Sequence, residues 1–111
     1  MARILVVEDD TGQLDIRRQI LEHAGYEVVT AQNASEALER LTGCQLVVTD
    51  LRIPRPEDGM RLIQAASGVA RIIVLSGGQP DATLAVDEFL TKPCPSKKLL
   101  EAIAKWTSES R

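Results

Sequence analysis

Acidic, hydroxyl and ammonium side chains stand at the ends of four short apolar runs in this chain. The groups are Glu8-Asp9-Asp10, Asp50, Ser76 beside Gly77, and Lys92. Several carboxylates in one crevice repel one another unless a cation lies among them. Mg²⁺ suits such oxygen ligands, because it takes one or two protein carboxylates and completes its shell with water and phosphate oxygens. If the chain brings these groups together, their chemistry is that of a metal-assisted phosphate site.

Asp50 is the member of this set that could form a covalent bond to phosphorus. A carboxylate can act as a nucleophile and form an acyl phosphate, and bound Mg²⁺ would offset the charge of the incoming phosphoryl group. Lys92 would supply a compact positive charge to the phosphoryl oxygens, and Ser76 would donate a hydrogen bond to them. Gly77 would leave room for the phosphoryl group to approach.

The groups can meet only if the apolar runs before them are strands of one sheet. Short runs typical of strands occupy Ile4–Val7, Tyr26–Thr30, Leu46–Asp50, Ile72–Leu75 and Glu88–Thr91. Apolar residues near helical spacing occupy Thr11–Ala24, Ala34–Leu41, Met60–Ala66, and a last segment from Pro95 or Ser96 to Trp106. Pro54 and Pro56 predict a loop before the third helix. This alternation predicts a parallel sheet with helices on both faces, and ligands bind outside the carboxyl ends of such strands.

Composition and charge exclude several other classes of function. The 111 residues suit one domain, 1–111, and the net charge of −3 indicates neither nucleic-acid binding nor attraction to an anionic membrane surface. The longest apolar runs are far too short to cross a bilayer or to form a signal peptide. We therefore expect a cytoplasmic protein. There, Cys44 and Cys94 are expected to be free thiols, because they lack the spacing of metal ligands.

Together, these segments resemble the receiver domain of two-component response regulators, the chemotaxis-protein-like fold. The residues that carry the resemblance are Ile4-Leu5-Val6-Val7-Glu8-Asp9-Asp10, Val47-Val48-Thr49-Asp50-Leu51-Arg52-Ile53-Pro54, Asp58-Gly59, Ile73-Val74-Leu75-Ser76-Gly77 and Phe89-Leu90-Thr91-Lys92-Pro93. They span nearly the whole chain and follow the order of that family. The resemblance implies a flavodoxin-like, doubly wound α/β fold whose five parallel strands have the order 2-1-3-4-5.

The resemblance also implies a cofactor and partners. Asp50 would take a phosphoryl group from a histidine kinase or a histidine phosphotransfer protein, and the modification would switch protein–protein interactions. Mg²⁺ would be held by Glu8 and Asp9 (one directly, the other through water), by Asp50, and by the backbone carbonyl of Arg52.

Signal transmission is a further implication of the resemblance. Ser76 would move toward the phosphoryl group, and the ring of Phe89 would turn inward. The Lys92–Pro93 peptide bond would be cis, as cis peptides are largely a proline feature. Such a domain catalyses its own phosphorylation and dephosphorylation and is not an enzyme with a separate substrate. The output partner is undefined, and a homodimer is compatible with the pattern.

The segment between Ser76 and Lys92 is shorter than is usual in this family. It spans 16 positions (92 − 76), and about ten residues remain for a crossover between parallel strands that usually needs about a dozen or more. Two glycines and a proline there also disfavour a long helix. We predict that the fourth helix is missing or reduced to about one turn around Asp81–Ala85. Output would then use a surface other than the usual face of helix four, strand five and helix five, or a remodelled loop.

Simpler interpretations exist for the acidic residues. Glu8–Asp10 could simply be the solvated start of a helix, with Asp10 or Thr11 as the N-cap and Gln13 closing a capping box. Asp50 alone would be an ordinary acid at the end of a strand. The phosphate interpretation is favoured because the ends of four strands agree with it.

Two alternative functions belong to other classes. A receiver-like interaction domain that does not depend on phosphorylation would explain the short segment, but the intact acids, Ser76 and Lys92 argue against it. A nucleotide- or flavin-binding enzyme is disfavoured, because the loop after the first strand has only Gly12 and lacks both GxGxxG and GxxxxGK[ST]. Arg52 and Arg55, beside the acceptor, either favour anionic phosphodonors or are exposed loop charges.

Overall fold

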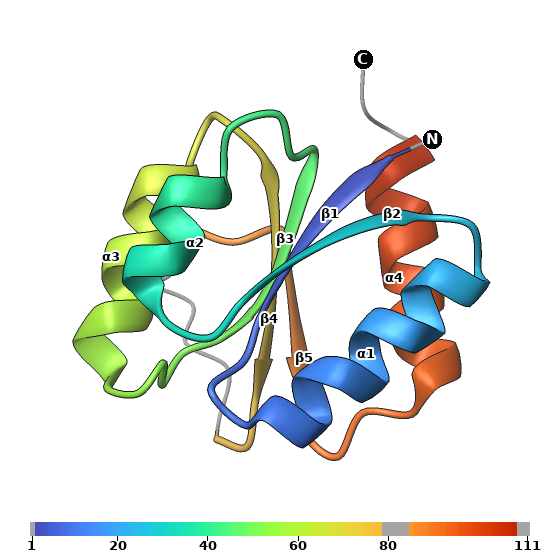
Figure 1. Cartoon of the computed structure of the whole chain (residues 1–111), viewed down its shortest axis with the longest axis horizontal. Helices are drawn as coiled ribbons and strands as arrows, with labels where there is room; N and C mark the ends of the chain where they lie inside the picture. The colour runs from blue at the N-terminus through green and yellow to red at the C-terminus, as the bar shows by residue number, and fades with distance from the viewer. Residues whose placement is uncertain (1, 79–84, 109–111) are drawn as a thin grey trace.

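The carboxyl ends of all five predicted strands lie at one edge of a single sheet. The computed structural model describes residues 2–78 and 85–108. Its strands are β1 (Arg3–Val7), β2 (Glu27–Ala31), β3 (Leu46–Asp50), β4 (Arg71–Ser76) and β5 (Glu88–Thr91). They pair in parallel in the order β2-β1-β3-β4-β5 (Figure 1). The predicted strand order and the flavodoxin-like α/β fold are therefore confirmed.

Four helices within the described residues cover the two faces of this sheet. One face carries α1 (Thr11–His23) and α4 (Ser96–Ser108), and the other carries α2 (Ala34–Arg40) and α3 (Pro56–Ala66) (Figure 1). As predicted, Asp10 is the N-cap of α1, where its carboxylate accepts a hydrogen bond from Gln13 N at 3.1 Å. The Gln13 side chain accepts a hydrogen bond from Arg17 instead of closing the predicted capping box. No helix in residues 2–78 and 85–108 has the length and apolar character needed to cross a membrane.

Alternation along the strands divides the core into two halves. In β1, Ile4 and Val6 pack with α1 and α4, whereas Leu5 and Val7 pack with α2 and α3. All four side chains are fully buried. A strand covered on both faces has no exposed side, which explains its continuous apolar sequence. This interior strand, which lies between β2 and β3, places the acids that follow Val7 at the carboxyl edge.

The third helix begins earlier than its apolar pattern predicts. The pattern predicts a start near Met60, but α3 begins at Pro56. Proline suits the first turn of a helix, because the N–H group that it lacks has no intrahelical partner there. The Asp58 carboxylate also accepts a hydrogen bond from Arg55 N at 3.2 Å, which satisfies a donor at the helix start. Pro56 therefore starts the helix rather than breaking the chain.

The connection between β4 and β5 forms no helix in its described parts. Gly77 and Gly78 follow β4 in a bend, and residues 85–87 lead into β5 without helical structure. The predicted single turn around Asp81–Ala85 lies, apart from Ala85, outside the described residues. The last helix, α4, follows β5 directly, as the sequence predicts.

Candidate functional site

Asp50, Lys92 and Glu8 meet at the carboxyl edge of the sheet, although they are far apart in the sequence. Asp50 ends β3, Lys92 follows β5, and Glu8 follows β1. The Lys92 ammonium group donates a hydrogen bond to Asp50 Oδ2, and its nitrogen lies 3.6 Å from Glu8 Oε1. Three of the predicted site residues therefore form one cluster around a single ammonium group.

Asp50 is fixed at the rim of the sheet by its chain neighbours. Its Oδ1 accepts a hydrogen bond from Arg52 N at 3.2 Å, and its carbonyl oxygen accepts one from the buried Thr49 hydroxyl at 2.8 Å. The loop that follows is tightly packed, because a Cβ on Gly59 would come within 2.0 Å of the Leu51 carbonyl oxygen. The Asp50 side chain is still 16% exposed, so its carboxylate remains accessible at the edge.

Glu8 is a buried acid with partners on both carboxylate oxygens. Only 3% of its side chain is exposed. Its Oε1 accepts a hydrogen bond from Arg17 Nη1 at 2.5 Å, and its Oε2 accepts one from Asp10 N at 3.2 Å. Such partners are needed, because an unpaired buried charge is strongly unfavourable.

Arg17 belongs to this cluster but is absent from the predicted site residues. Its spacing is the signal that could have revealed it. It lies three residues after Leu14 and four before Leu21, the two buried apolar residues of α1, and therefore shares their helix face. A charged side chain on the buried face of a helix requires a polar partner, and Glu8 is that partner.

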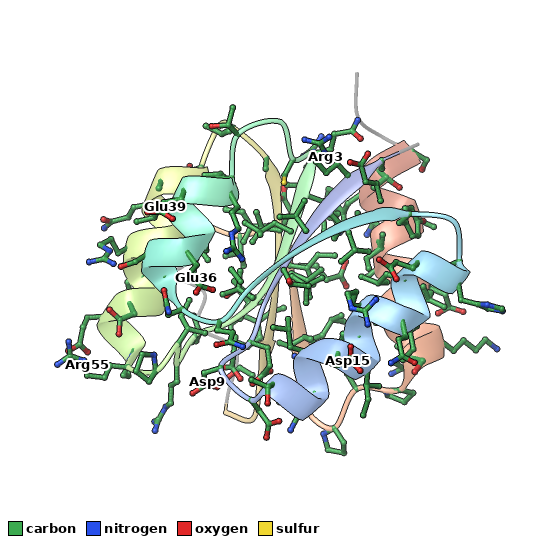
Figure 2. The ribbon with its side chains drawn as sticks, viewed as in Figure 1. Arg3, Asp9, Asp15, Glu36, Glu39 and Arg55 are labelled. Carbon is green, nitrogen blue, oxygen red and sulfur yellow. The ribbon has the colours of Figure 1, made fainter. Side chains whose placement is uncertain are left out.

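Asp9 adds a third carboxylate to the edge. Figure 2 shows it in the loop between β1 and α1, at the lower rim of the sheet. Desolvation raises the pKa of Asp9 most, and the hydrogen bond and charge of Glu8 and the charge of Asp50 raise it further. The three carboxylates exceed the two cations, Lys92 and Arg17, so these five side chains carry excess negative charge. The cluster is therefore suited to attract a cation.

Ser76 and Gly77 lie at the end of β4, next to Lys92. Lys92 N donates a hydrogen bond to the Ser76 carbonyl oxygen at 2.8 Å, which joins the ends of β4 and β5. The Lys92–Pro93 peptide bond that follows is cis. The Ser76 hydroxyl oxygen accepts a hydrogen bond from Gly78 N at 3.2 Å, and a hydroxyl that accepts one bond still has its own hydrogen to donate. Gly77 is exposed, and no described atom beyond its chain neighbours lies within 4 Å of where its Cβ would be.

Phe89 and Ser76 occupy neighbouring strands. Phe89 pairs with Val74 in the register of β4 and β5, whereas Ser76 pairs with Thr91. The Phe89 ring is half-buried and packs against the core half that α2 and α3 cover. The predicted switch residues are therefore two register positions apart, with the ring packed against this core half.

The two arginines that follow Asp50 are placed differently. Arg52 is exposed and contributes its backbone N–H group to the Asp50 carboxylate. Arg55 lies 3.7 Å from Glu57 and from Asp58 at the start of α3, and its side chain points outward there (Figure 2). Of the two alternatives for these arginines, the contacts of Arg55 favour an exposed loop charge.

The oxygen donors at this edge fit Mg²⁺ by chemical type. Asp9 and Asp50 supply the hard carboxylate oxygens that Mg²⁺ takes alongside water and phosphate. Across residues 2–78 and 85–108, however, no three His, Cys, Asp or Glu side chains are grouped as ligands of one ion. Glu8 and Asp50 direct oxygens at Arg17 and Lys92. Two protein cations thus occupy part of the donor set.

A doubly wound parallel sheet with acids, serine and lysine at its carboxyl ends defines the chemotaxis-protein-like class of signalling domains. Residues 4–104 match the family model described as the response regulator receiver domain. The chain therefore belongs to the receiver-domain family of two-component signal transduction. A domain of this family is a signalling domain rather than a classical enzyme.

Similar proteins agree with this assignment. The transcriptional regulatory protein GlrR of Escherichia coli is 38% identical over 113 residues, which cover 92% of this chain and 25% of that regulator. The chain thus spans about a quarter of that relative's length. A CheY-like receiver from Methanospirillum hungatei superposes with a TM-score of 0.85 at 30% identity, covering 99% of both chains. The response regulator TrrA from Thermotoga maritima, in complex with Mg²⁺-BeF, has a TM-score of 0.83 at 29% identity and covers 96% of this chain and 99% of its own.

Proposed function

We propose that this domain accepts a phosphoryl group on Asp50 from a histidine kinase or a histidine phosphotransfer protein. The modification would switch protein–protein interactions. The observation that carries the proposal is the Lys92 ammonium group shared between Asp50 and Glu8. An acid at a strand end is common, but one that is held by a lysine within a crowded acidic cluster is suited to nucleophilic chemistry.

The proposed reaction is a displacement at phosphorus. An Asp50 carboxylate oxygen attacks the phosphorus of a phosphohistidine, the bond from phosphorus to the imidazole nitrogen breaks, and an acyl phosphate forms. Lys92 then pairs with the phosphoryl oxygens. These oxygens are negatively charged, whereas the phosphorylated Asp50 carboxylate no longer is. The Ser76 hydroxyl donates to another phosphoryl oxygen, and the open space beside Gly77 admits the group.

Mg²⁺ would supply charge neutralisation at the phosphoryl group. Asp9 and Asp50 would hold it, together with the Arg52 backbone carbonyl and, directly or through water, Glu8. The excess negative charge of the cluster and the raised pKa of Asp9 support this assignment, as does the Mg²⁺-BeF complex of the similar TrrA protein.

Output would follow from a rearrangement around Ser76 and Phe89. Phe89 lies on an edge strand, next to residues 85–87, which form no helix. We therefore assign the output to a surface other than the usual helix-four face, or to a remodelled loop there. Residues 1–111 would act as a single receiver domain in this scheme.

Phosphorylation by a small-molecule donor tests the proposal. Wild-type protein incubated with Mg²⁺ and acetyl phosphate should gain the mass of one phosphoryl group, whereas an Asp50→Asn variant should gain none. Asp15→Asn, which changes an exposed acid on α1, is the matched control and should be modified like the wild type. An unmodified wild-type protein, under conditions that modify a known receiver, would overturn the proposal. Modification of Asp50→Asn would place the acceptor elsewhere.

The second candidate is a receiver-like interaction domain that does not depend on phosphate. It is favoured by one observation: Arg17 already pairs with Glu8 inside the chain. This candidate requires that Mg²⁺ does not bind and that an Asp50→Asn variant retains the wild-type interactions. A Mg²⁺ titration of the wild-type protein separates the two functions.

A further inference from the structure

The acidic cluster contains a cation that the acceptor chemistry does not use. Lys92 has a role in the proposed transfer, because it contacts Asp50 and would follow the phosphoryl group. Arg17 instead contacts Glu8 on the α1 side. Its guanidinium group is held at two points, since Nη1 donates to Glu8 Oε1 at 2.5 Å and Nη2 donates to Gln13 Oε1 at 3.2 Å.

Burial makes the contact between Arg17 and Glu8 a strong one. The two side chains are 14% and 3% exposed, so water screens their attraction far less than it would at the surface. Arg17 also lines a small pocket between α1 and α4 with Cys94 and Leu99. An arginine remains charged at any ordinary pH. Glu8 therefore has a permanent counter-ion within the fold.

A divalent cation entering the cluster competes with this counter-ion. It must share Glu8 with Arg17 or displace it, and it is repelled by the guanidinium charge in either case. Within residues 2–78 and 85–108, no arginine guanidinium group pairs with Asp9 or Asp50, although Asp50 pairs with Lys92. These two carboxylates would remain the main anionic ligands of the divalent cation. The charge of the Glu8 carboxylate is thus already neutralised by Arg17 within the fold.

We propose that Arg17 is a built-in counter-ion that competes with the divalent cation for Glu8 and so sets the affinity of the acceptor site for Mg²⁺. This inference rests on the proposed function, in which the acidic cluster binds Mg²⁺. It assigns Arg17 as a positioning residue, because it acts on the metal through Glu8.

Cation binding to an Arg17→Met variant tests the inference. Methionine keeps much of the stem and removes the charge, so Mn²⁺ binding measured by electron paramagnetic resonance should tighten about tenfold. Mg²⁺ should also raise the unfolding temperature of Arg17→Met more than that of the wild type. Arg18→Met is the matched control. Arg18 is the next residue of α1 and pairs with Asp15 and Glu22, so its removal should change the affinity by less than about twofold.

Two further variants protect the test against misfolding and indirect effects. Arg17→Lys retains the charge without the two-point contact and should show an intermediate gain in affinity. In a Glu8→Gln background, Arg17→Met should give much less gain, because the shared carboxylate is gone. Circular dichroism of each variant without metal checks that it is folded.

The outcomes separate this inference from the proposed function. Equal or weaker cation binding by Arg17→Met and Arg17→Lys, with normal binding by the wild type, overturns the role of Arg17 and leaves the proposed function standing. A gain that persists in full in the Glu8→Gln background also overturns it, because the competition would not involve Glu8. Absence of cation binding in every protein, the wild type included, overturns both.

Discussion

At the amino edge of the sheet the ion pairs are more exposed and each anion has its own cation, whereas at the carboxyl edge the pairs are more buried and the carboxylates outnumber the cations. Figure 2 shows Arg3 and Asp9 at these opposite ends of β1. At the amino edge, Arg3 lies 2.8 Å from Glu27, with side chains 43% and 50% exposed. Arg71 lies 3.2 Å from Asp87 at the same edge. Each of these anions has a cation of its own.

The carboxyl edge contains the same kinds of groups in a different arrangement. Among the described residues, Glu8, Asp9 and Asp50 share two cations, Arg17 and Lys92. Desolvation, and then the neighbouring carboxylates, raise the pKa of Asp9. Exposed pairs contribute about 0.2–1 kcal/mol each, but crowded carboxylates cost stability unless a cation lies among them. The difference indicates that the amino edge serves the fold and that the carboxyl edge is kept for chemistry.

An aromatic side chain reinforces the amino edge. Trp106 Nε1 donates a hydrogen bond to Glu88 Oε1 at 2.8 Å. The cationic groups of Arg71 and Lys105 lie 5.2 and 4.8 Å from the centre of the Trp106 ring, within the range of cation–π contacts. The edge thereby connects β4, β5 and α4 through side chains that need no ligand.

Removing one cation from each edge should give the largest contrast. Lys92→Met should lower the rate of phosphorylation by acetyl phosphate by about 100-fold, because a preorganised positive charge at the phosphoryl oxygens is lost. Arg71→Met, the matched change at the amino edge, should leave that rate within about twofold. Mass spectrometry over time measures both. A large loss of rate in Arg71→Met would contradict the division between the edges.

The second contrast concerns the stability of the amino edge. The Asp87 carboxylate accepts a hydrogen bond from Ile72 N at 2.7 Å, and Asp87 N donates to the Ile72 carbonyl oxygen at 2.9 Å. Asp87→Ala should lower the free energy of unfolding by about 1–3 kcal/mol, because the buried Ile72 N–H group loses its acceptor. Urea unfolding measures this change.

An Asp87→Asn variant controls for charge in that experiment. It keeps an oxygen acceptor for Ile72 N and loses only the partly exposed ion pair with Arg71, so it should be destabilised by less than about 1 kcal/mol. Phosphorylation of both variants should match the wild type. Equal destabilisation by Asn and Ala would show that the ion pair, and not the hydrogen bond, stabilises this edge.

The architecture can be predicted from the sequence because strands buried on both faces have continuous apolar sequences. The unbroken run Ile4–Val7 predicts a central strand, and the acids after it predict the carboxyl edge. The start of α3 could not be read in the same way, because Pro56 serves equally well as a chain breaker and as the first residue of a helix.

The carboxylates of the site and Lys92 can be predicted from the sequence, but the second cation, Arg17, cannot be predicted as readily. The types and positions of Glu8, Asp50 and Lys92 were sufficient to predict that they meet. The pairing of Arg17 with Glu8 depends on which face of α1 turns toward β1, and a single charged residue in a helix carries that information only weakly. The spacing of Arg17 from Leu14 and Leu21 indicates that it lies on the buried face, but most arginines in proteins are exposed.

The smallest contrast lies in how stability depends on pH at two acids, Asp9 in the loop before α1 and Asp15 in α1. The folded protein raises the pKa of Asp9 above its usual 3.8, chiefly by desolvation. The folded state therefore binds the Asp9 proton more tightly than the unfolded state does, and stability falls as the pH rises through the window between 3.8 and the raised pKa. Above that window the charged carboxylate carries a constant cost.

An Asp9→Asn variant removes this cost. In metal-free buffer at pH 7 it should be more stable than the wild type by less than about 1 kcal/mol, because Asp9 is largely exposed. The gain should disappear below pH 3.8, where Asp9 is protonated in both states. Thermal melts over a range of pH values measure it, and a loss of stability at neutral pH would contradict the crowding of the carboxyl edge.

Asp15→Asn provides a control of opposite sign. A hydrogen bond from Arg18 is the largest cause that lowers the pKa of Asp15 below 3.8, so the charged Asp15 stabilises the fold at neutral pH. The variant should therefore be less stable than the wild type at pH 7, and the difference should vanish as the pH falls through the lowered pKa. Mg²⁺ should abolish the contrast, because it would remove the cost at Asp9, and with it the gain of Asp9→Asn, and leave the pair of Asp15 with Arg18 unchanged. Opposite responses of two neighbouring aspartates would show that position at the carboxyl edge, and not acidity alone, decides what a carboxylate does in this domain.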